Sequence, residues 1–109
     1  MSGREEITSD IENFISEYGA GNCYIGITNN VRRRFSEHNL LADNGNDPRT
    51  AQMRYITRDA GTEDNAREIE MGFIGRHQNI IHGGPGGGGN DSRFVYIYLV
   101  IPGETNEDV

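Results

Sequence analysis

Two positively ionisable side chains occupy helix positions that normally face a hydrophobic core. In the segment YIGITNNVRRRFSEH, Val31, Arg34, Phe35 and His38 recur with the spacing of one helix face. Burying a charge without a partner is expensive, so Arg34 and His38 require a counter-charge, a solvent-filled cleft or a ligand. The alternative is structural, with Arg34 reaching an acidic neighbour and His38 capping a helix end.

A later segment, NAREIEMGFIGRHQN, places an acidic side chain in the same kind of position. Glu70 lies on the apolar stripe of the expected helix, whereas Glu68 does not. The stripe consists of Ala66, Ile69, Phe73, Ile74 and His77. Two helices therefore aim groups of opposite charge toward the interior, where they would form either a structural salt bridge or an active site.

Two glycine-containing segments are candidates for contact with a ligand. Gly26 leaves space beside Tyr24 in the strand NCYIGIT, which suits either a shallow site or a bend in the strand. The loop HGGPGGGGND lacks the lysine and hydroxyl of a phosphate-binding P-loop, so an NTPase is excluded. Its glycines can present backbone N–H groups to an anion, or they can form a linker.

The overall charge limits the possible partners. The chain has a formal charge of −7 and contains no lysine, so all of its Lys+Arg residues are arginines. This balance predicts weak nonspecific affinity for nucleic acid, and any phosphate contact must be local. An all-arginine set suits two-pronged phosphate recognition, but a compositional bias explains it equally well.

The pattern of elements predicts one small α/β (α+β) domain of 109 residues. A three-stranded antiparallel sheet is expected from residues 22–28, 51–57 and 93–101. Helices are expected over 9–18, 30–41 and 65–79, capped by Ser9 in a capping box with Glu12, by Thr28 or Asn29, and by Thr62. Gly19 ends the first helix, and residues 1–6 and 103–109 are expected to be flexible tails.

Localisation follows from what the sequence lacks. There is no signal-peptide pattern and no apolar run of about 20 residues, so a cytoplasmic protein is expected. The single cysteine, Cys23, lies in an apolar run and is expected to be a small buried hydrophobe rather than a catalytic thiol.

The residues singled out above resemble the GIY-YIG nuclease superfamily, in particular small prokaryotic GIY-YIG-like proteins. The YIG half of the motif is present as Tyr24, Ile25 and Gly26. The family places an arginine ten residues after this tyrosine, a histidine four residues later and a glutamate on a later helix, which match Arg34, His38 and Glu70.

The first half of the family motif, GIY, is absent or displaced. Family members carry it on a strand just before the YIG strand, where this chain has the first helix and EYGAGN. The C-terminal strand, FVYIY, is expected to take the place of that strand, with Tyr96 or Tyr98 acting as the first tyrosine.

The resemblance implies a metal-dependent endonuclease that hydrolyses a phosphodiester in nucleic acid, most simply DNA. Glu70 would hold Mg²⁺ or Mn²⁺, Arg34 would contact the scissile phosphate, and Tyr24 with His38 and Tyr96 would position or deprotonate the attacking water. We further expect substrate binding by Gly26, Arg33, Tyr98 and Asn90, with Asn79 as the alternative to Asn90 for the asparagine that completes many family sites. A homodimer would enlarge the footprint of so small a protein.

Because the chain is acidic, a second function remains open. A non-catalytic GIY-YIG-like module would use the same cleft to bind a nucleotide, a small phosphorylated ligand or a partner protein. Metal binding at Glu70 separates this module from the nuclease.

Overall fold

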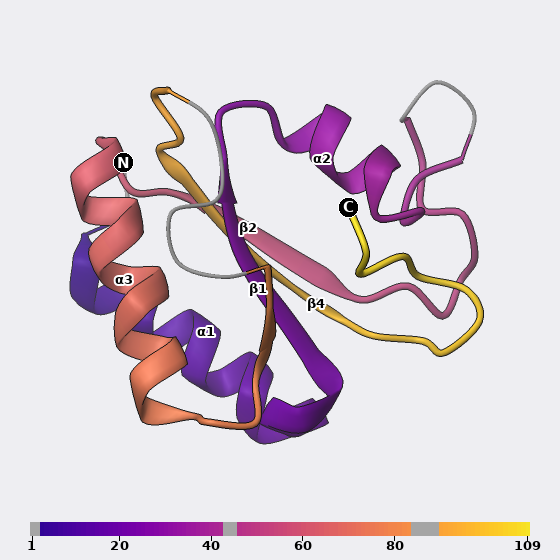
Figure 1. Cartoon of the computed structure of the whole chain (residues 1–109), viewed down its shortest axis with the longest axis horizontal. Helices are drawn as coiled ribbons and strands as arrows, with labels where there is room; N and C mark the ends of the chain where they lie inside the picture. The colour runs from indigo at the N-terminus through magenta and orange to yellow at the C-terminus, as the bar shows by residue number, and fades with distance from the viewer. Residues whose placement is uncertain (1–2, 43–45, 84–89) are drawn as a thin grey trace.

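A mixed four-stranded sheet with three α-helices forms the core of the fold (Figure 1). The computed structural model describes residues 3–42, 46–83 and 90–109. The elements, in chain order, are α1 (Arg4–Tyr18), a 3-10 turn η1 (Ala20–Asn22), β1 (Cys23–Thr28), α2 (Val31–Glu37), β2 (Tyr55–Asp59), α3 (Glu63–Arg76), β3 (Ile81–His82) and β4 (Phe94–Leu99). No helix within the described ranges has both the length and the apolar character needed to cross a membrane.

The strand order is β2-β4-β1-β3, so the C-terminal strand lies inside the sheet. β4 pairs antiparallel with both β1 and β2, and its register places Tyr96 opposite Gly26 and Tyr98 opposite Tyr24. The predicted three-stranded antiparallel sheet is incomplete, because β3 adds a fourth strand parallel to β1. A strand of two residues is too short to produce a detectable alternation of polar and apolar side chains.

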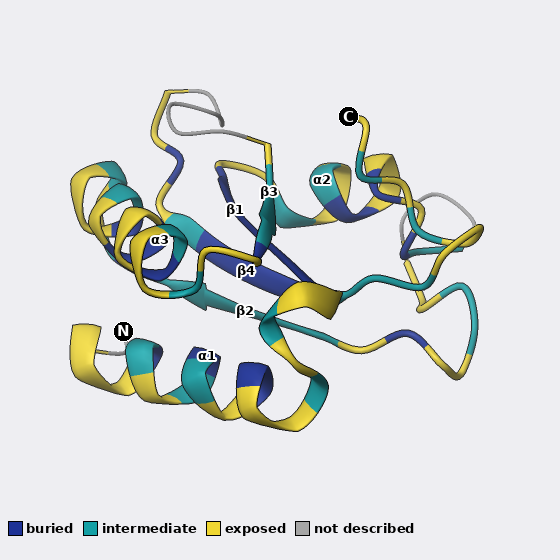
Figure 2. Cartoon of the chain, turned by 60° about the horizontal axis from the view of Figure 1, so that its bottom comes forward, coloured by how far each residue is buried: buried dark blue, intermediate teal, exposed yellow. Residues whose placement is uncertain are grey.

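The two faces of the sheet carry different side chains and are covered by different helices, whose positions Figure 2 shows. One face packs against α1 and α3 through an aliphatic cluster that includes Ile25, Ile27, Val95 and Ile97. The opposite face contributes Tyr24, Tyr96 and Tyr98, which pack with Phe35 of α2 and with Leu40 and Met53. The alternation predicted for β1 and β4 is confirmed, because every second side chain along a strand points to the same face.

The first helix is longer than predicted, and the Ser9 capping box is wrong. α1 begins at Arg4 with Gly3 at its N-cap, so Ser9 lies inside the helix. The extra turn brings Ile7 onto the same buried stripe as Ile11, and burial of that side chain favours continuing the helix toward the N-terminus. The predicted end at Gly19 is confirmed, since this residue adopts φ 88°.

The cap of α2 also differs from the prediction. Asn30, and neither Thr28 nor Asn29, occupies the N-cap, and its side chain accepts a hydrogen bond from the Arg33 backbone N–H. Asn39 has φ 63°, and the Leu40 N–H donates to the Phe35 carbonyl, so α2 ends well before residue 41.

The bounds of two other predicted elements shift for similar local reasons. The Thr62 cap of α3 is confirmed, because its hydroxyl accepts from the Asn65 N–H, but α3 ends at Arg76 rather than at residue 79. The strand predicted over 51–57 is instead Tyr55–Asp59. A turn in which the Met53 N–H donates to the Thr50 carbonyl precedes it and delays the extended segment.

Candidate active site

Three tyrosines and a histidine form an aromatic cluster between the sheet and α2. The Tyr24 ring stacks on Tyr98 at 5.2 Å between centroids, and His38 packs on Tyr24 at 4.6 Å and on Tyr98 at 4.9 Å. Tyr24, Tyr96, Tyr98 and His38 are each at most 2% exposed. Their polar atoms are therefore held in fixed positions by packing, which is the condition for a preorganised site.

Gly26 is required for the position of Tyr96. A Cβ at residue 26 would lie 2.5 Å from the Tyr96 hydroxyl oxygen and 2.6 Å from its Cζ, distances that real Cβ atoms do not tolerate. Gly26 therefore leaves room for the Tyr96 ring to lie over the neighbouring strand. The open space predicted at Gly26 is filled by this ring. Gly83 plays a similar part, because a Cβ there would lie 2.8 Å from the Tyr24 hydroxyl.

The Arg34 guanidinium uses all three nitrogens. Nε donates to the Tyr96 hydroxyl at 3.2 Å, Nη1 pairs with the Glu37 carboxylate at 2.9 Å, and Nη2 donates to the Val109 carbonyl at 2.8 Å. Burial alone lowers the pKa of Arg34, but the bond to Glu37 and the Tyr96 hydroxyl raise it overall, so the cation is secure. An Arg34–Glu70 salt bridge is wrong, because the carboxylate partner is Glu37. The other structural alternative, in which Arg34 reaches an acidic neighbour and His38 caps a helix end, agrees with this ion pair and with His38 at the C-cap of α2.

His38 is fully buried and hydrogen-bonded through both ring nitrogens. Nδ1 lies 2.7 Å from the Asn106 carbonyl oxygen, and Nε2 lies 2.8 Å from the Tyr96 hydroxyl. Burial lowers the pKa of His38, and the Arg34 cation lowers it further, while the bond to Asn106 acts in the opposite direction. The imidazole is therefore neutral at pH 7. Arg34 and His38, which lie on a helix face that normally meets the core, thus have polar partners on β4 and on the C-terminal segment.

The tyrosine hydroxyls are held in the protonated form. Burial raises the pKa of Tyr24, Tyr96 and Tyr98, and Arg34 partly offsets this effect at Tyr24 and Tyr96. At Tyr98 a second cause acts in the same direction, because its hydroxyl donates to the Glu107 carboxylate at 2.8 Å. A free tyrosinate base is thus disfavoured in the unliganded protein.

Glu70 is the most unusual ionisable group of the structure. Its side chain is 3% exposed, and Oε1 has no hydrogen-bond partner in the described part of the chain. Burial raises the pKa of this carboxyl from 4.5 to about 7, and Arg67 opposes the rise. Its charge in turn raises the pKa of Tyr24 and Tyr96, which places Glu70 within electrostatic reach of the aromatic cluster.

The side chains that could bind a metal ion suit a divalent cation only if water or substrate supplies most of the ligands. Among residues 3–42, 46–83 and 90–109, no three His, Cys, Asp or Glu side chains are grouped to hold a metal ion. Magnesium is commonly bound by one or two carboxylates together with water and substrate phosphate oxygens. The unpartnered Oε1 of Glu70 fits that pattern, because a buried carboxylate oxygen without a hydrogen-bond donor can serve as a metal ligand.

Two residues predicted to bind substrate lie together at the N-terminus of α2. Asn29 connects them, because its Oδ1 accepts from Arg33 at 3.3 Å and its Nδ2 donates to the Asn90 carbonyl at 2.9 Å. Arg33 and Asn90 are exposed, unlike Tyr98 and Gly26, which belong to the buried cluster. The predicted substrate-binding set is thus divided between a buried part and a surface part.

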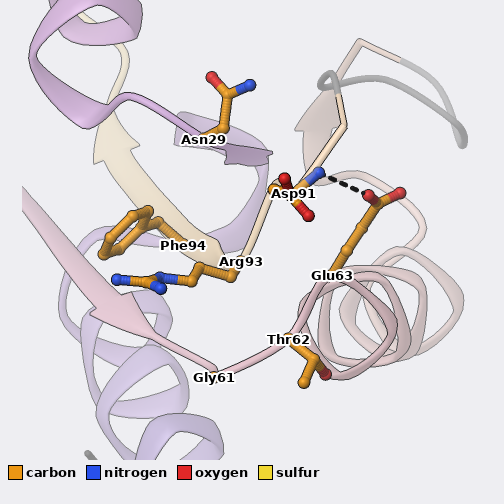
Figure 3. A pocket seen from close by; sticks show the side chains of 7 residues that line it. All are labelled: Asn29, Gly61, Thr62, Glu63, Asp91, Arg93 and Phe94. Carbon is orange, nitrogen blue, oxygen red and sulfur yellow. Dashed lines mark hydrogen bonds between the residues drawn. The ribbon is translucent and has the colours of Figure 1, made fainter.

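A pocket of about 420 Å³ opens near this surface part (Figure 3). Asn29, Glu63, Asp91 and Arg93 contribute to its lining, and the Glu63 carboxylate accepts a hydrogen bond from the Asp91 backbone N–H at 2.9 Å. The aromatic cluster does not line this pocket. Of the glycine-rich loop singled out in the sequence, residues 84–89 lie outside the described residues.

One of the comparisons with known proteins finds a match, to a family model. The family model of the GIY-YIG catalytic domain matches residues 8–82. The chain belongs to the GIY-YIG family. Membership implies a nuclease-family function and a nucleic acid substrate, and nucleases of this family typically use a divalent metal. No curated protein and no solved structure matches the chain significantly.

The GIY-YIG match ends before the C-terminal part of the site. It includes Tyr24, Arg34, His38 and Glu70, whereas Tyr96 and all of β4 follow residue 82. The segment after β4 also contributes contacts that sequence reasoning missed, namely those of Asn106, Glu107 and Val109. No periodicity or motif marks these residues, because their partners lie far away in the sequence and backbone carbonyls carry no sequence signal.

Proposed function

We propose that this GIY-YIG protein is a metal-dependent endonuclease that hydrolyses a phosphodiester in nucleic acid. The observation that carries the proposal is the convergence of Arg34 Nε and His38 Nε2 on the Tyr96 hydroxyl, at 3.2 Å and 2.8 Å. Glu70 supports it, because its Oε1 is buried without a hydrogen-bond partner in the described part of the chain and its charge raises the pKa of Tyr96. A cation, a neutral proton acceptor, a hydroxyl and a free carboxylate are the groups that phosphodiester hydrolysis requires.

Arg34 supplies the phosphate contact. Its Nη2 donates to the main-chain oxygen of Val109, and a phosphate oxygen can take the place of this acceptor. The ion pair with Glu37 keeps the guanidinium on this side of α2 while the exchange takes place. The contact is local, in agreement with a chain whose overall charge is −7.

His38 and Tyr96 handle the proton of the attacking water. Tyr96 is protonated and His38 is neutral, so the Tyr96 hydroxyl can pass its proton to His38 Nε2 while its oxygen takes a proton from water. The net result is that water loses a proton and His38 gains one. Tyr24 packs on His38 and holds the imidazole in line with this transfer.

Glu70 is the residue that would hold the divalent cation, Mg²⁺ or Mn²⁺. When bound, the cation would neutralise charge that develops on the phosphate oxygens. The protein's own contribution is a buried carboxylate whose Oε1 has no hydrogen-bond partner in the described ranges, while the ion pair of the nearby Arg67 is made with Glu63. Such an arrangement reduces stability and is therefore expected at a functional site rather than in a core.

β4 is proposed to replace the missing first strand of the family. It pairs antiparallel with β1 along its whole length and presents Tyr96 beside the YIG glycine, Gly26. Tyr96, and not Tyr98, is therefore proposed as the counterpart of the first family tyrosine, because Tyr96 contacts Arg34 directly. Tyr98 instead contacts His38 and Glu107.

A substrate panel tests the proposed activity. The protein is incubated with single-stranded, duplex and branched DNA and RNA, with Mg²⁺, with Mn²⁺ and with EDTA. We expect metal-dependent cleavage, with DNA as the preferred substrate, and loss of cleavage in Glu70→Gln. The matched control is Glu68→Gln, which removes an exposed carboxylate two residues away on the same helix and should cleave normally. Light scattering on the same preparation tests the predicted homodimer.

A second candidate is the non-catalytic binding module. The observation that favours it is the full occupancy of Arg34, whose three nitrogens are all bonded within the protein. Absence of cleavage on every substrate, together with binding of a short phosphodiester that Arg34→Lys abolishes, would establish this function instead.

A further inference from the structure

A second acidic residue reaches the aromatic cluster from beyond the family match. The C-terminal segment returns beside α2, as Figure 1 shows, and its Glu107 carboxylate accepts a hydrogen bond from the Tyr98 hydroxyl at 2.8 Å. Backbone atoms fix this part of the segment in place. The Asn106 N–H donates to the His38 carbonyl at 2.8 Å, and the Asn106 carbonyl contacts the His38 ring at 2.7 Å.

The partners of His38 determine which ring nitrogen carries the proton. The Asn106 carbonyl can only accept, so Nδ1 must donate to it. Tyr98 agrees with this assignment, because its hydroxyl proton is directed to Glu107 and its oxygen, 3.0 Å from Nδ1, is left as an acceptor. In the neutral imidazole Nε2 then carries a lone pair and accepts the Tyr96 hydroxyl proton.

We propose that Glu107 is a positioning residue for the reaction. Through the Tyr98 hydroxyl, and together with the Asn106 carbonyl, it holds the His38 proton on Nδ1 and leaves Nε2 as the proton acceptor for Tyr96. The inference rests on the proposed nuclease function for its role in the reaction. The hydrogen-bonded chain runs from Glu107 through Tyr98 and His38 to Tyr96.

Each proton that moves in the proposed step has a donor and an acceptor. As water attacks phosphorus, its proton moves to the Tyr96 oxygen, and the original Tyr96 proton moves to His38 Nε2. The imidazolium that forms donates from Nδ1 to Asn106, and its charge is offset by the Glu107 carboxylate one hydroxyl away. The proton then returns from Nε2 through the Tyr96 hydroxyl to the leaving oxygen, which restores neutral His38.

Charged and titratable groups from three elements and from the C-terminal segment face His38. Arg34 disfavours the imidazolium, whereas Glu37 and Glu107 favour it. The groups around the ring are Arg34 and Glu37 from α2, Tyr24 from β1, Tyr96 and Tyr98 from β4, and Glu107 from the C-terminal segment. Arg34 reaches Nε2 of the ring through the Tyr96 hydroxyl, and Glu107 reaches Nδ1 through the Tyr98 hydroxyl, so removal of the Glu107 charge should act on the Nδ1 side of His38.

The matched pair for the test is Glu107→Gln and Asp108→Asn. Each variant removes one negative charge from the same segment. Asp108 contacts Asn106 through its backbone N–H, which donates to the Asn106 side-chain oxygen, and Asp108→Asn keeps this hydrogen bond. Tyr98→Phe is the second variant, because it breaks the same chain at the hydroxyl. Dispersion of the backbone NMR spectrum verifies that each variant is folded.

The first readout is the long-range ¹H–¹⁵N NMR spectrum of the histidine rings, with the His38 signal assigned by its loss in His38→Gln. We expect the Nδ1–H tautomer in the parent protein. We also expect a lower His38 titration midpoint in Glu107→Gln and Tyr98→Phe, and a smaller effect in Asp108→Asn. An Nε2–H tautomer in the parent, or equal shifts in Glu107→Gln and Asp108→Asn, would overturn the proposal.

The second readout is cleavage, measured as a pH–rate profile. Proton transfer by a positioned group contributes about 100-fold or more to a rate, so a loss of about tenfold is expected when only its positioning is weakened. Glu107→Gln and Tyr98→Phe should show this loss in kcat and should not add in the double variant, since both interrupt one chain. Normal cleavage by both variants would overturn the role. Because the NMR result does not require cleavage, an inactive protein with the expected tautomer would refute the nuclease function and leave the geometry of His38 established.

Discussion

Glu70→Gln is predicted to stabilise the protein at alkaline pH. The folded state raises the pKa of Glu70 from 4.5 to about 7 by burial, so the folded protein binds a proton more tightly than the unfolded chain does. Stability contributed by the neutral carboxyl is present below pH 4.5 and is lost as the pH rises through about 7. A glutamine is neutral at every pH and escapes this loss.

The magnitude follows from the distance between the two pKa values. From 4.5 to about 7 is about 2.5 pH units, and each unit corresponds to about 1.4 kcal/mol, so the effect is about 3 kcal/mol. The side chain is 3% exposed, so solvent screens little of it. The glutamine amide of the variant also buries polar atoms, and this lowers the free energy of unfolding by the same amount at every pH. The change with pH is therefore the quantity to compare.

Urea denaturation between pH 4 and pH 8 measures this change. The unfolding free energy of Glu70→Gln minus that of the parent should rise by about 3 kcal/mol over this range. Glu68→Gln serves as the control, because Glu68 is largely exposed and forms only a surface ion pair with Arg4. A Glu70→Gln difference that stays constant with pH would refute the reasoning, since it would mean that the carboxylate has a partner in solution.

Two further predictions concern β1. Gly26→Ala should destabilise the protein by about 1–3 kcal/mol and abolish cleavage, because the new Cβ would lie 2.5 Å from the Tyr96 hydroxyl. Thermal denaturation and the cleavage assay test this prediction. An active variant that is as stable as the parent would contradict it. The Cys23 thiol should resist Ellman's reagent at pH 8 in the folded protein and react after unfolding, because burial raises the pKa of this thiol to about 11. Rapid labelling of the native protein would contradict this prediction and would show that β1 opens readily.

The chemistry of the site was more predictable from sequence than its architecture. Arg34, His38 and Glu70 could be singled out because each breaks an otherwise apolar helical stripe, and Glu70 and His38 are indeed buried. A polar residue on a buried stripe is conspicuous, since burial without a partner is costly. Sequence reasoning could not assign the partners, and the expected Arg34–Glu70 alternative gave way to Glu37, one turn along the same helix.

The remaining features depend on contacts that local sequence does not encode. β3 is too short to show a strand pattern, and its parallel pairing with β1 follows from the path of the chain after α3. Residues 103–109 are polar and acidic, which predicts a flexible tail, yet hydrogen bonds from Asn106 and Glu107 join this segment to the aromatic cluster. The proposal of Tyr96 rather than Tyr98 depends on the register, which places Tyr96 opposite Gly26, and on the contact of Tyr96 with Arg34, and neither is encoded locally.

Single-turnover cleavage by Arg34→Lys tests the central claim most directly, because it asks whether the group that meets Tyr96 also meets the phosphate. Lysine keeps the charge but cannot donate to Tyr96, Glu37 and a phosphate oxygen from one planar fork. The control, Arg32→Lys, changes an exposed arginine on the same helix. We predict a loss of about 100-fold or more for Arg34→Lys and a near-parental rate for Arg32→Lys. Equal rates for the two variants would contradict the assignment of this cluster as the active site.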